Sequence, residues 1–379
     1  MKKYFYIGLF GLLIVEAVKA YLLMPMPGSQ DYESVSFVYF LYSKRWLFRI
    51  LFMILILAGV KEVFQKRKWI PIVLLLFTTA VIYMADFMMS ADVMFKETTA
   101  LSFKPKNESK LNDSSLVLCV VHKEIAKAYP IQFLSFHHQV QDTIADKAIM
   151  VTYCSVCRSG IVFEPIVNGK KEKFRLVGMT HWNAMFEDHE TKSWWSQADG
   201  ICIAGPLKGA MLPDFPSQQM TIKKFTELYP NALIMQADPL YMSEYDTERV
   251  FESGKIKTGI ERTDTASWKE KSWVVGIEVG DKSIAYDWNE LKRTRIINDS
   301  IDNKKVVVAL SDDQQSYCAF LRPDASNFTI SHDTLFSNGK AYDFSGKDLE
   351  NPGKQLTAIP AKQEFWHSWK QFHPATLKH

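Results

Sequence analysis

The stretch AKAYPIQFLSFHHQVQDTIADKAIMVTYCSVCRSGIVF, residues Ala126–Phe163, aligns without a gap with SIAYDWNELKRTRIINDSIDNKKVVVALSDDQQSYCAF, residues Ser283–Phe320. The offset is constant at 157 residues (283 minus 126), and the matched positions include an Ala-Tyr pair, an aspartate, a lysine and the final phenylalanine. A second aligned pair, Phe215–Pro230 and Ile359–Pro374, has an offset of 144 residues (359 minus 215). The second copy is therefore 13 residues shorter between the blocks (157 minus 144), and the pattern predicts an internal repeat of domain size.

Both copies predict the same elements in the same order. A β-rich run and a short strand ending at the Ala-Tyr pair come first, followed by a short helix, a β-branched strand, a tight turn and another strand. Pro130 suits the first turn of the helix in the first copy, and a proline ends the later amphipathic helix of each copy. We therefore expect an α+β fold, mostly antiparallel β, with two tandem pseudo-equivalent repeats at residues 110–235 and 270–376.

Residues 1–95 have a different character, because long apolar runs replace the charged, globular composition of residues 96–379. A membrane-spanning helix needs about 20 mostly apolar residues. The second of three apolar stretches reaches that length only if Arg49 extends its charge to the membrane surface or if Val63 and Phe64 belong to the helix. We predict a membrane anchor of three transmembrane helices, at about residues 4–24, 45–64 and 69–89.

The basic residues predict how these helices are oriented, because cytoplasmic loops are rich in lysine and arginine. Basic clusters precede the first helix and separate the second from the third: Lys2, Lys3, Lys61, Lys66, Arg67 and Lys68. A smaller group, Lys44, Arg45 and Arg49, opposes this orientation. With the larger clusters in the cytoplasm, we expect a multi-pass protein of the cell inner or plasma membrane whose residues 96–379 are extracytoplasmic.

A cleaved signal peptide is the alternative interpretation of the first helix, because Ala17 and Ala20 near its end are small. Glu16 and Lys19 interrupt its apolar region, however, and two further apolar segments follow, so an anchor is favoured. The soluble part lies outside in either case.

Composition narrows the expected partners. The net charge is only +3, and no lysine and arginine cluster follows a periodic face in the soluble part, so we expect no nucleic-acid partner. Five cysteines, an odd number with a single close pair, do not fit a small domain held together by disulfides. The expected partners are the membrane and a membrane or extracytoplasmic protein.

Differences between the copies indicate functional residues, because the shared scaffold does not need what only one copy retains. The first copy alone carries two thiols and two imidazoles, and these align with other residues in the second: Cys154 with Ser311, Cys157 with Gln314, His137 with Thr294 and His138 with Arg295. The region that is longer in the first copy predicts an extra loop able to cover a site, with His181, Trp182, His189, Trp194 and Trp195.

The Cys154–Cys157 motif lies between two predicted strands and admits three interpretations. It lacks the helix start that lowers the pKa of thioredoxin-type cysteines, so it resembles a metal knuckle for copper or zinc. Further ligands would then come from His137, His138, Met179, His181 or Cys202. Arg158 could instead stabilise a thiolate and favour redox chemistry. The third interpretation is an inert pair, either a structural disulfide or two buried free thiols.

Several segments form a specific combination: AKAYP (Ala126–Pro130), the Tyr-Cys-x-x-Cys of Tyr153–Cys157, TKSWWSQADGICIAGPLKGAMLP (Thr191–Pro213), VVGIEVGDKSIAYDW and FWHSWKQFHP. On these segments residues 110–376 resemble the bacterial domain of unknown function 3179 family. A histidine typically precedes an Asn-Asp or similar pair in that family, and Gln141-Asp142 here favours His137 over His138. Some members are described as selenoproteins, which favours nucleophilic redox chemistry at the cysteine motif, and the three-helix anchor departs from members with a simple export signal.

We therefore expect a membrane-anchored extracytoplasmic protein with a thiol-redox or soft-metal site. Cys154 and Cys157 would be the nucleophile and the resolving thiol, or two metal ligands, with His137 as the base or third ligand. His138, His181 and Cys202 are further candidate ligands. The alternative is a non-catalytic module that binds a ligand or partner, with a structural disulfide and a cleft lined by Trp194, Trp195, Trp366 and Trp369. The sequence leaves open whether the protein is an enzyme.

Overall fold

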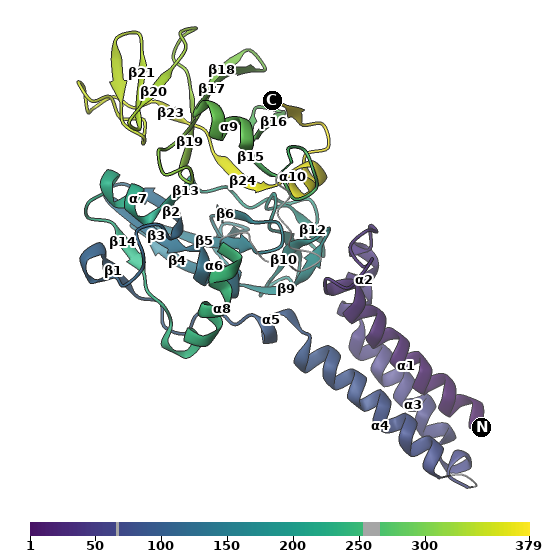
Figure 1. The fold of residues 1–379 in the computed structure, drawn as a ribbon. Helices are drawn as coiled ribbons and strands as arrows, with labels where there is room; N and C mark the ends of the chain where they lie inside the picture. The colour runs from purple at the N-terminus through teal and green to yellow at the C-terminus, as the bar shows by residue number, and fades with distance from the viewer. Residues whose placement is uncertain (66–67, 253–265) are drawn as a thin grey trace. The chain divides into compact units, whose positions relative to one another are not determined.

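The computed structural model describes residues 1–65, 68–252 and 266–379 (Figure 1). By its packing the chain divides into two compact units. The first unit comprises Met1–Lys96, Lys173–Ser196 and Ile201–Met211, and the second comprises Glu97–Glu172, Gln197–Gly200 and Leu212–His379. Two basic residues used in the orientation argument, Lys66 and Arg67, lie outside the described residues.

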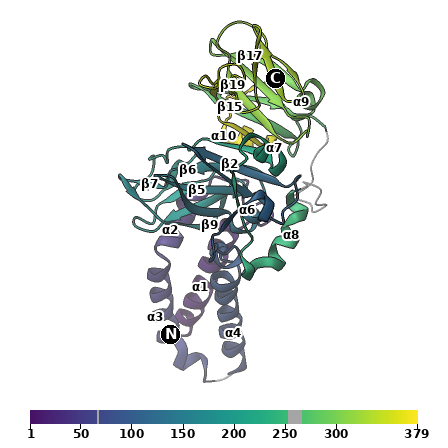
Figure 2. The same cartoon turned by 90° about the vertical axis from the view of Figure 1, so that its left-hand side faces the viewer.

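The first unit begins with a group of helices. They are α1 (Lys2–Leu23), α2 (Val35–Ser43), α3 (Arg45–Val63), α4 (Trp69–Tyr83), which continues as the π-helix η1 (Met84–Met88), and α5 (Ala91–Met94). Among them, α1, α3 and α4 lie side by side in Figures 1 and 2. Close packing of α1 on α3 requires glycine, since a Cβ at Gly8 would lie 2.6 Å from the Phe52 carbonyl oxygen and one at Gly59 would lie 2.6 Å from Phe5 N. Phe5, Leu9 and Ile56 are buried in this contact.

Two of these helices, Lys2–Leu23 and Trp69–Met88, are long and apolar enough to cross a membrane. The prediction of three such helices is therefore confirmed for two segments. The middle segment does form a helix, α3, but Arg49, Lys61 and Glu62 make it too polar to qualify by composition.

Four charged side chains hold α1, α3 and η1 together. Glu16 is 0% exposed and accepts hydrogen bonds from Lys19 Nζ at 2.5 Å and from Arg49 Nε at 2.6 Å. Asp86 accepts from Lys19 Nζ at 2.6 Å and also pairs with Arg49. Because an unpaired buried charge is very costly, these two acids and two bases compensate each other.

Residues 174–204 of the first unit form an antiparallel sheet of order β12-β11-β10-β9, with β9 (Phe174–Thr180), β10 (Asn183–Asp188), β11 (Trp194–Ser196) and β12 (Cys202–Ala204). The segment predicted as an extra loop therefore contains most of a sheet. Its Trp194 is fully buried and makes edge-to-face contacts with Tyr39 and Tyr42 of α2. Arg175 pairs with Asp92 at 2.8 Å and with Glu187 at 2.6 Å.

The second unit combines β-sheets with short helices. One sheet has the strand order β1 (Phe103–Pro105), β14 (Leu233–Met235), β3 (Ile125–Pro130), β2 (Leu116–His122) and β13 (Ser217–Thr221), and another has the order β4 (Gln139–Ile144), β5 (Lys147–Cys154) and β6 (Ser159–Phe163). Later in the chain, one sheet has the order β24 (Ala361–Phe365), β15 (Trp273–Val279), β16 (Lys282–Asp287) and β25 (Leu377–Lys378), and the next has the order β17 (Ile296–Ile301), β18 (Lys304–Leu310), β19 (Tyr317–Leu321) and β23 (Thr357–Ala358). Two smaller sheets consist of β20 (Thr329–Ser331), β21 (Thr334–Ser337) and β22 (Lys340–Tyr342), and of β7 (Ile166–Val167) and β8 (Lys170–Lys171). Its helices are η2 (Lys106–Glu108), α6 (Ile131–His137), α7 (Ile222–Leu228), η3 (Pro239–Tyr241), α8 (Met242–Glu252), α9 (Trp288–Thr294) and α10 (Trp366–Phe372).

Most strand pairs of the second unit are antiparallel, and β14–β3 and β16–β25 are parallel. This confirms the prediction of an α+β fold with mostly antiparallel sheet. The order strand, strand, helix, strand, strand, strand occurs once from β2 to β6 and again from β15 to β19. One hydrophobic core draws residues from both stretches, among them Val117 and Ala128 with Val307 and Phe320.

Gly276 on β15 gives a test of this packing. A Cβ at Gly276 would lie 2.3 Å from two ring atoms of Trp369, a fully buried side chain. Gly276→Ala should therefore destabilise the detergent-solubilised chain by about 1–3 kcal/mol, because the core is overpacked. Urea or thermal unfolding measures the change. Gly353→Ala is the matched control, since a Cβ there meets only Asn351 Oδ1 at 3.9 Å; equal losses in both variants would contradict the packing.

Candidate functional site

The cysteine motif forms a tight, buried turn between β5 and β6. Cys154 pairs with Ser159 across the antiparallel ladder, and Arg158 N donates to the Cys154 carbonyl oxygen at 2.8 Å. Arg158 has a φ of 61°, which lets the chain reverse within these few residues. The thiols of Cys154 and Cys157 are 1% and 0% exposed, and neither forms a disulfide. The turn therefore places two sulfur atoms inside the protein.

Neighbouring polar side chains fix the base of this turn. Thr152 Oγ1 donates to the Ile161 carbonyl oxygen at 2.7 Å, and Gln197 Nε2 lies 3.2 Å from Thr152 Oγ1. Ser159 Oγ donates to Gln197 Oε1 at 3.1 Å. Thr152, Ser159 and Gln197 are all buried, so these bonds hold the two strands in register beneath the cysteines.

A strand from much later in the chain covers the turn. Phe365 N of β24 donates to the Cys157 carbonyl oxygen at 3.0 Å. This bond brings Glu364 of the same strand and Ser368 of α10 to the cysteines. Both side chains are buried, at 4% and 0% exposure.

The electrostatics of the site follow from this burial. Desolvation raises the pKa of the Cys157 thiol well above its usual value, the adjacent Cys154 raises it further, and interaction with Ser368 opposes the shift. Burial also raises the pKa of Glu364 to about 7, with Ser368 and Lys362 lowering it and Glu278 raising it. Cys157 is therefore a thiol at neutral pH, whereas Glu364 titrates there.

His138 is the histidine attached to the cysteine strand. Its Nδ1 donates to the Tyr153 carbonyl oxygen at 2.9 Å, and Tyr153 N donates back to the His138 carbonyl oxygen at 2.9 Å. Burial lowers the pKa of His138 to about 4, so the ring is neutral at pH 7. Because Nδ1 carries the proton, Nε2 is the accepting nitrogen of the neutral ring.

His137, the histidine favoured by the family resemblance, contacts a different element. Its Nε2 lies 2.5 Å from Tyr245 Oη of α8, and its ring also meets Tyr241 edge-to-face. The two adjacent histidines thus point in different directions, as expected for neighbours at the end of a short helix. Its role as base or third ligand stays a prediction.

The remaining candidate ligands belong to the first unit. Met179 lies near the end of β9. In the turn that follows, His181 has a φ of 48°, and the Nδ1 atom of His181 lies 3.1 Å from Thr180 Oγ1. Cys202 is buried in β12, and burial raises the pKa of its thiol to about 11. Within residues 1–65, 68–252 and 266–379, no group of three or more His, Cys, Asp or Glu side chains is arranged to hold a metal ion.

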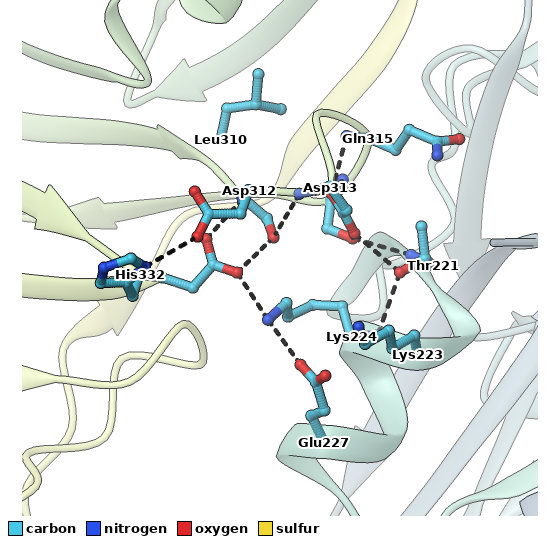
Figure 3. Close-up of polar contacts among 12 residues, drawn as sticks. Thr221, Lys223, Lys224, Glu227, Leu310, Asp312, Asp313, Gln315 and His332 are labelled. Atoms are coloured by element: carbon cyan, nitrogen blue, oxygen red, sulfur yellow. Dashed lines mark hydrogen bonds and ion pairs between the residues drawn. The ribbon is translucent and has the colours of Figure 1, made fainter. Parts of the chain in front are cut away.

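The counterpart turn, Ser311–Ser316 between β18 and β19, is held by ionic and hydroxyl contacts (Figure 3). Asp313 Oδ2 accepts from Thr221 Oγ1 at 2.8 Å and from Ser316 Oγ at 2.6 Å. Lys224 of α7 pairs with Asp333 at 2.7 Å, and Asp333 also accepts from Ser311 Oγ at 2.7 Å. Two turns in equivalent strand positions are thus built from opposite chemistry, thiols in one and charges in the other.

Glu364 and Ser368 were not among the residues expected from the sequence, although a signal was present. In the second aligned block they stand opposite Met220 and Lys224. The carboxylate of Glu364 aligns with an apolar residue, just as the two cysteines align with residues that are not cysteines. The difference between the aligned segments that indicated the cysteines therefore also indicates Glu364. The thiol and metal-binding candidates predicted from the sequence all lie between His137 and Cys202, so Glu364 and Ser368 were missed.

Residues 98–376 match the family described as Protein of unknown function (DUF3179). The chain belongs to this family. The DUF3179 match covers the cysteine turn, both histidines beside it, and Glu364 and Ser368. No curated protein and no solved structure was found to match the chain.

The raised pKa of Glu364 predicts a pH-dependent stability. Between about pH 4.5 and 7 the folded chain keeps a proton on Glu364 that the unfolded chain has lost. The contribution of Glu364 to the free energy of unfolding is therefore fully present below pH 4.5 and decreases as the pH rises to 7. The loss amounts to about 3 kcal/mol. Glu364→Gln should lack it and be the more stable protein at pH 8. Urea unfolding of both proteins from pH 4 to pH 8 tests this, and parallel curves would rule out a buried titrating carboxyl.

Proposed function

We propose that this DUF3179 protein is a membrane-anchored dithiol protein that exchanges electrons with disulfides through Cys154 and Cys157. The observation that carries the proposal is the buried cysteine pair without a disulfide, in which Cys154 raises the pKa of the Cys157 thiol. His138 and Glu364 add two groups able to hold a proton beside the pair. This combination supports redox chemistry better than a structural disulfide.

The exchange balances with a disulfide, R–S–S–R, as the oxidant. The Cys154 thiolate attacks one substrate sulfur, the S–S bond breaks, and the departing R–S⁻ takes up a proton. Cys157 then loses its proton, attacks Cys154 in the mixed disulfide and releases the second R–S⁻. Two electrons pass to the substrate, which leaves as two thiols, and the protein keeps a Cys154–Cys157 disulfide. The reverse sequence reduces the protein.

A soft-metal site is the less favoured form of the same hypothesis. Two thiolates alone can bind copper(I), but a zinc site needs further ligands. His138 Nε2 is the best placed nitrogen, because His138 is bonded to the residue before Cys154. Retention of metal by the purified chain therefore discriminates the two versions.

The helices of the first unit support a specific topology. Lys19 near the end of α1 contacts Asp86 at the end of the α4–η1 helix, so these two helices run in the same direction. The chain must then return along α3 between them. Pairing of Arg49 with Glu16 and Asp86 neutralises the charge that makes α3 polar. We propose that α3 also crosses the membrane and that the soluble part is extracytoplasmic, in the cell inner or plasma membrane.

The second unit is proposed to be an internal duplication. β2 to β5 and β15 to β18 begin at positions that differ by a constant 157 residues, for example Leu116 and Trp273. Tyr129 Oη donates to Asp142 at 2.7 Å, and Tyr286 Oη donates to Asp299 at 3.3 Å. His138 and Arg295 each end a helix in a left-handed backbone conformation. The His138 ring donates to the Tyr153 carbonyl oxygen of β5, and the Arg295 side chain donates to the Leu310 carbonyl oxygen of β18.

The same proposal explains one contact between the copies. Gln219 Nε2 donates to Gln363 Oε1 at 2.7 Å, and these two residues align with each other in the second repeated block. Equivalent residues meet only on an approximate twofold axis. The cysteine turn therefore packs on the second copy just as the Ser311–Ser316 turn packs on the first.

A cavity in the second unit favours the alternative of a binding module. It has a volume of about 510 Å³. Its lining includes the apolar and aromatic residues Val121, Phe225, Tyr229 and Ile359, and Lys347 is among its charged groups. Its mixed lining suits an amphipathic ligand or peptide. It holds none of the thiols of the cysteine turn, so ligand binding there would be independent of Cys154 and Cys157.

The dithiol proposal predicts which substitutions abolish exchange. Full-length protein reduced and then treated with an aromatic disulfide should lose two hydrogens on the peptide containing Cys154 and Cys157 and release two aromatic thiols. Cys154→Ser and Cys157→Ser should each remove this intramolecular disulfide, whereas Ser311→Ala, at the counterpart position, should not. Mass spectrometry of the digested protein gives the readout.

Two results would count against the dithiol proposal. One is a wild-type protein whose pair stays reduced after complete oxidation of accessible thiols. The other is stoichiometric copper or zinc in the purified chain that is lost in Cys154→Ser, which would favour a metal site.

A further inference from the structure

A cavity of about 330 Å³ lies in the first unit, where α1, α3, η1 and α5 meet β9 of the sheet. Cavities that bind small molecules measure about 300–1,000 Å³, so this one has room for a small charged group. Its lining is rich in charge. The charged side chains that line it are Lys19, Arg45, Arg49, Asp86, Asp92 and Arg175.

The first group of charges at this cavity is balanced. Lys19 and Arg49 each pair with both Glu16 and Asp86. Two cations and two carboxylates therefore offset one another, and this group presents no net charge to a ligand.

The second group is divided into a positive and a negative part. Arg175 pairs with Asp92 at 2.8 Å and with Glu187 at 2.6 Å, so two carboxylates share one guanidinium. Arg45 forms no ion pair within residues 1–65, 68–252 and 266–379; its Nη1 donates to the Tyr42 carbonyl oxygen at 2.7 Å, and its guanidinium lies 4.2 Å from the centroid of the Tyr42 ring. Arg175 Nη2 lies 2.6 Å from the hydroxyl of the same ring. Tyr42 thus separates an excess positive charge at Arg45 from an excess negative charge at Asp92.

Exposed aromatic side chains indicate that the cavity lies at a membrane surface. Tyr21, Trp46 and Tyr83 are exposed on α1, α3 and α4, at the helix ends that adjoin the cavity. Tyr4 and Trp69 are exposed at the opposite ends of α1 and α4. Tryptophan and tyrosine gather at both surfaces of a membrane. With the topology proposed above, the cavity therefore lies at the level of the lipid headgroups.

We propose that this cavity binds a membrane phospholipid whose headgroup carries a phosphate and a primary ammonium group. The inference rests on the proposed membrane topology and is independent of the dithiol chemistry. The phosphate accepts hydrogen bonds from the Arg45 guanidinium, and the ammonium group donates to the Asp92 carboxylate. The acyl chains extend along exposed apolar side chains of α3 and η1 near the cavity, among them Leu47, Ile50 and Phe87.

Charge complementarity selects this headgroup over others. A purely anionic headgroup would pair with Arg45 and leave the negative part of the cavity, at Asp92, without a cation. A headgroup with a quaternary ammonium group has the right charges but no N–H to donate to Asp92. A soluble phosphate ester lacks the acyl chains that cover the exposed apolar side chains beside the cavity.

The test uses the full-length chain, purified in detergent and stripped of lipid. It is mixed with equal amounts of phosphatidylethanolamine, phosphatidylglycerol and phosphatidylcholine with identical acyl chains, and native mass spectrometry counts the lipids that stay bound. The wild-type chain should retain one phosphatidylethanolamine, with a preference of about 10-fold over each of the other two lipids.

Four variants make the result specific. Arg45→Gln should weaken phosphatidylethanolamine binding about 10-fold, whereas Lys44→Gln should not, because this neighbouring exposed lysine does not line the cavity. Asp92→Asn should weaken binding of phosphatidylethanolamine but not of phosphatidylglycerol, a change of preference that a general loss of structure would not produce. Ala20→Phe, which fills the cavity without altering its charge, should weaken phosphatidylethanolamine binding and decides the question if Arg45→Gln does not fold.

The outcomes separate the site from the topology on which it rests. Equal retention of the three lipids by the wild-type chain, or equal phosphatidylethanolamine binding by Arg45→Gln and Lys44→Gln, overturns the headgroup site. Displacement of the lipid by an equal concentration of soluble glycerophosphoethanolamine overturns a lipid as the ligand. A wild-type chain that stays in solution without detergent overturns the membrane topology itself.

Discussion

The hydrogen bond from Phe365 N to the Cys157 carbonyl oxygen is the contact on which the candidate site depends. It ties the cysteine turn between β5 and β6 to β24, a strand from much later in the chain. Burial of both thiols, the raised pKa of Cys157 and the presence of Glu364 and Ser368 all follow from that one attachment. The candidate site is thus composite, because β24 and α10 contribute to it as well as the turn between β5 and β6.

Much of the fold could be predicted from the sequence because its signals are local. Alternation, β-branched runs and turn residues gave the α+β class, and apolar length gave the two candidate spanning helices. The ion pairs of Arg49 could not be predicted from the sequence of α3, in which Arg49 only interrupts an apolar run. Its partners Glu16 and Asp86 come from other helices. The packing of residues 173–196 with the first unit is equally non-local, and the sequence indicated only an extra loop there.

The candidate site was predictable only in part for the same reason. Cys154 and Cys157 are close in sequence, so their spacing identified them as a pair. His138 was predicted as a weaker candidate, and it directly precedes β4. Glu364 lies more than half the chain away and carries no motif. The preference for His137 came from the family resemblance, whereas the contacts attach His138 to the cysteine strand and His137 to Tyr245. Tertiary contact, and not spacing, decides which imidazole faces which partner.

Exposures of 1% and 0% at the two thiols have a kinetic consequence. An external disulfide cannot reach either sulfur while the turn is closed, so the proposed exchange requires a local opening of the chain. If that opening costs about 1.4 kcal/mol, one molecule in roughly ten is competent at any moment, and each further 1.4 kcal/mol lowers that fraction tenfold. The rate of the proposed exchange would then be set by the stability of the turn as well as by the reactivity of the sulfur atoms, for a small disulfide and for a protein disulfide alike.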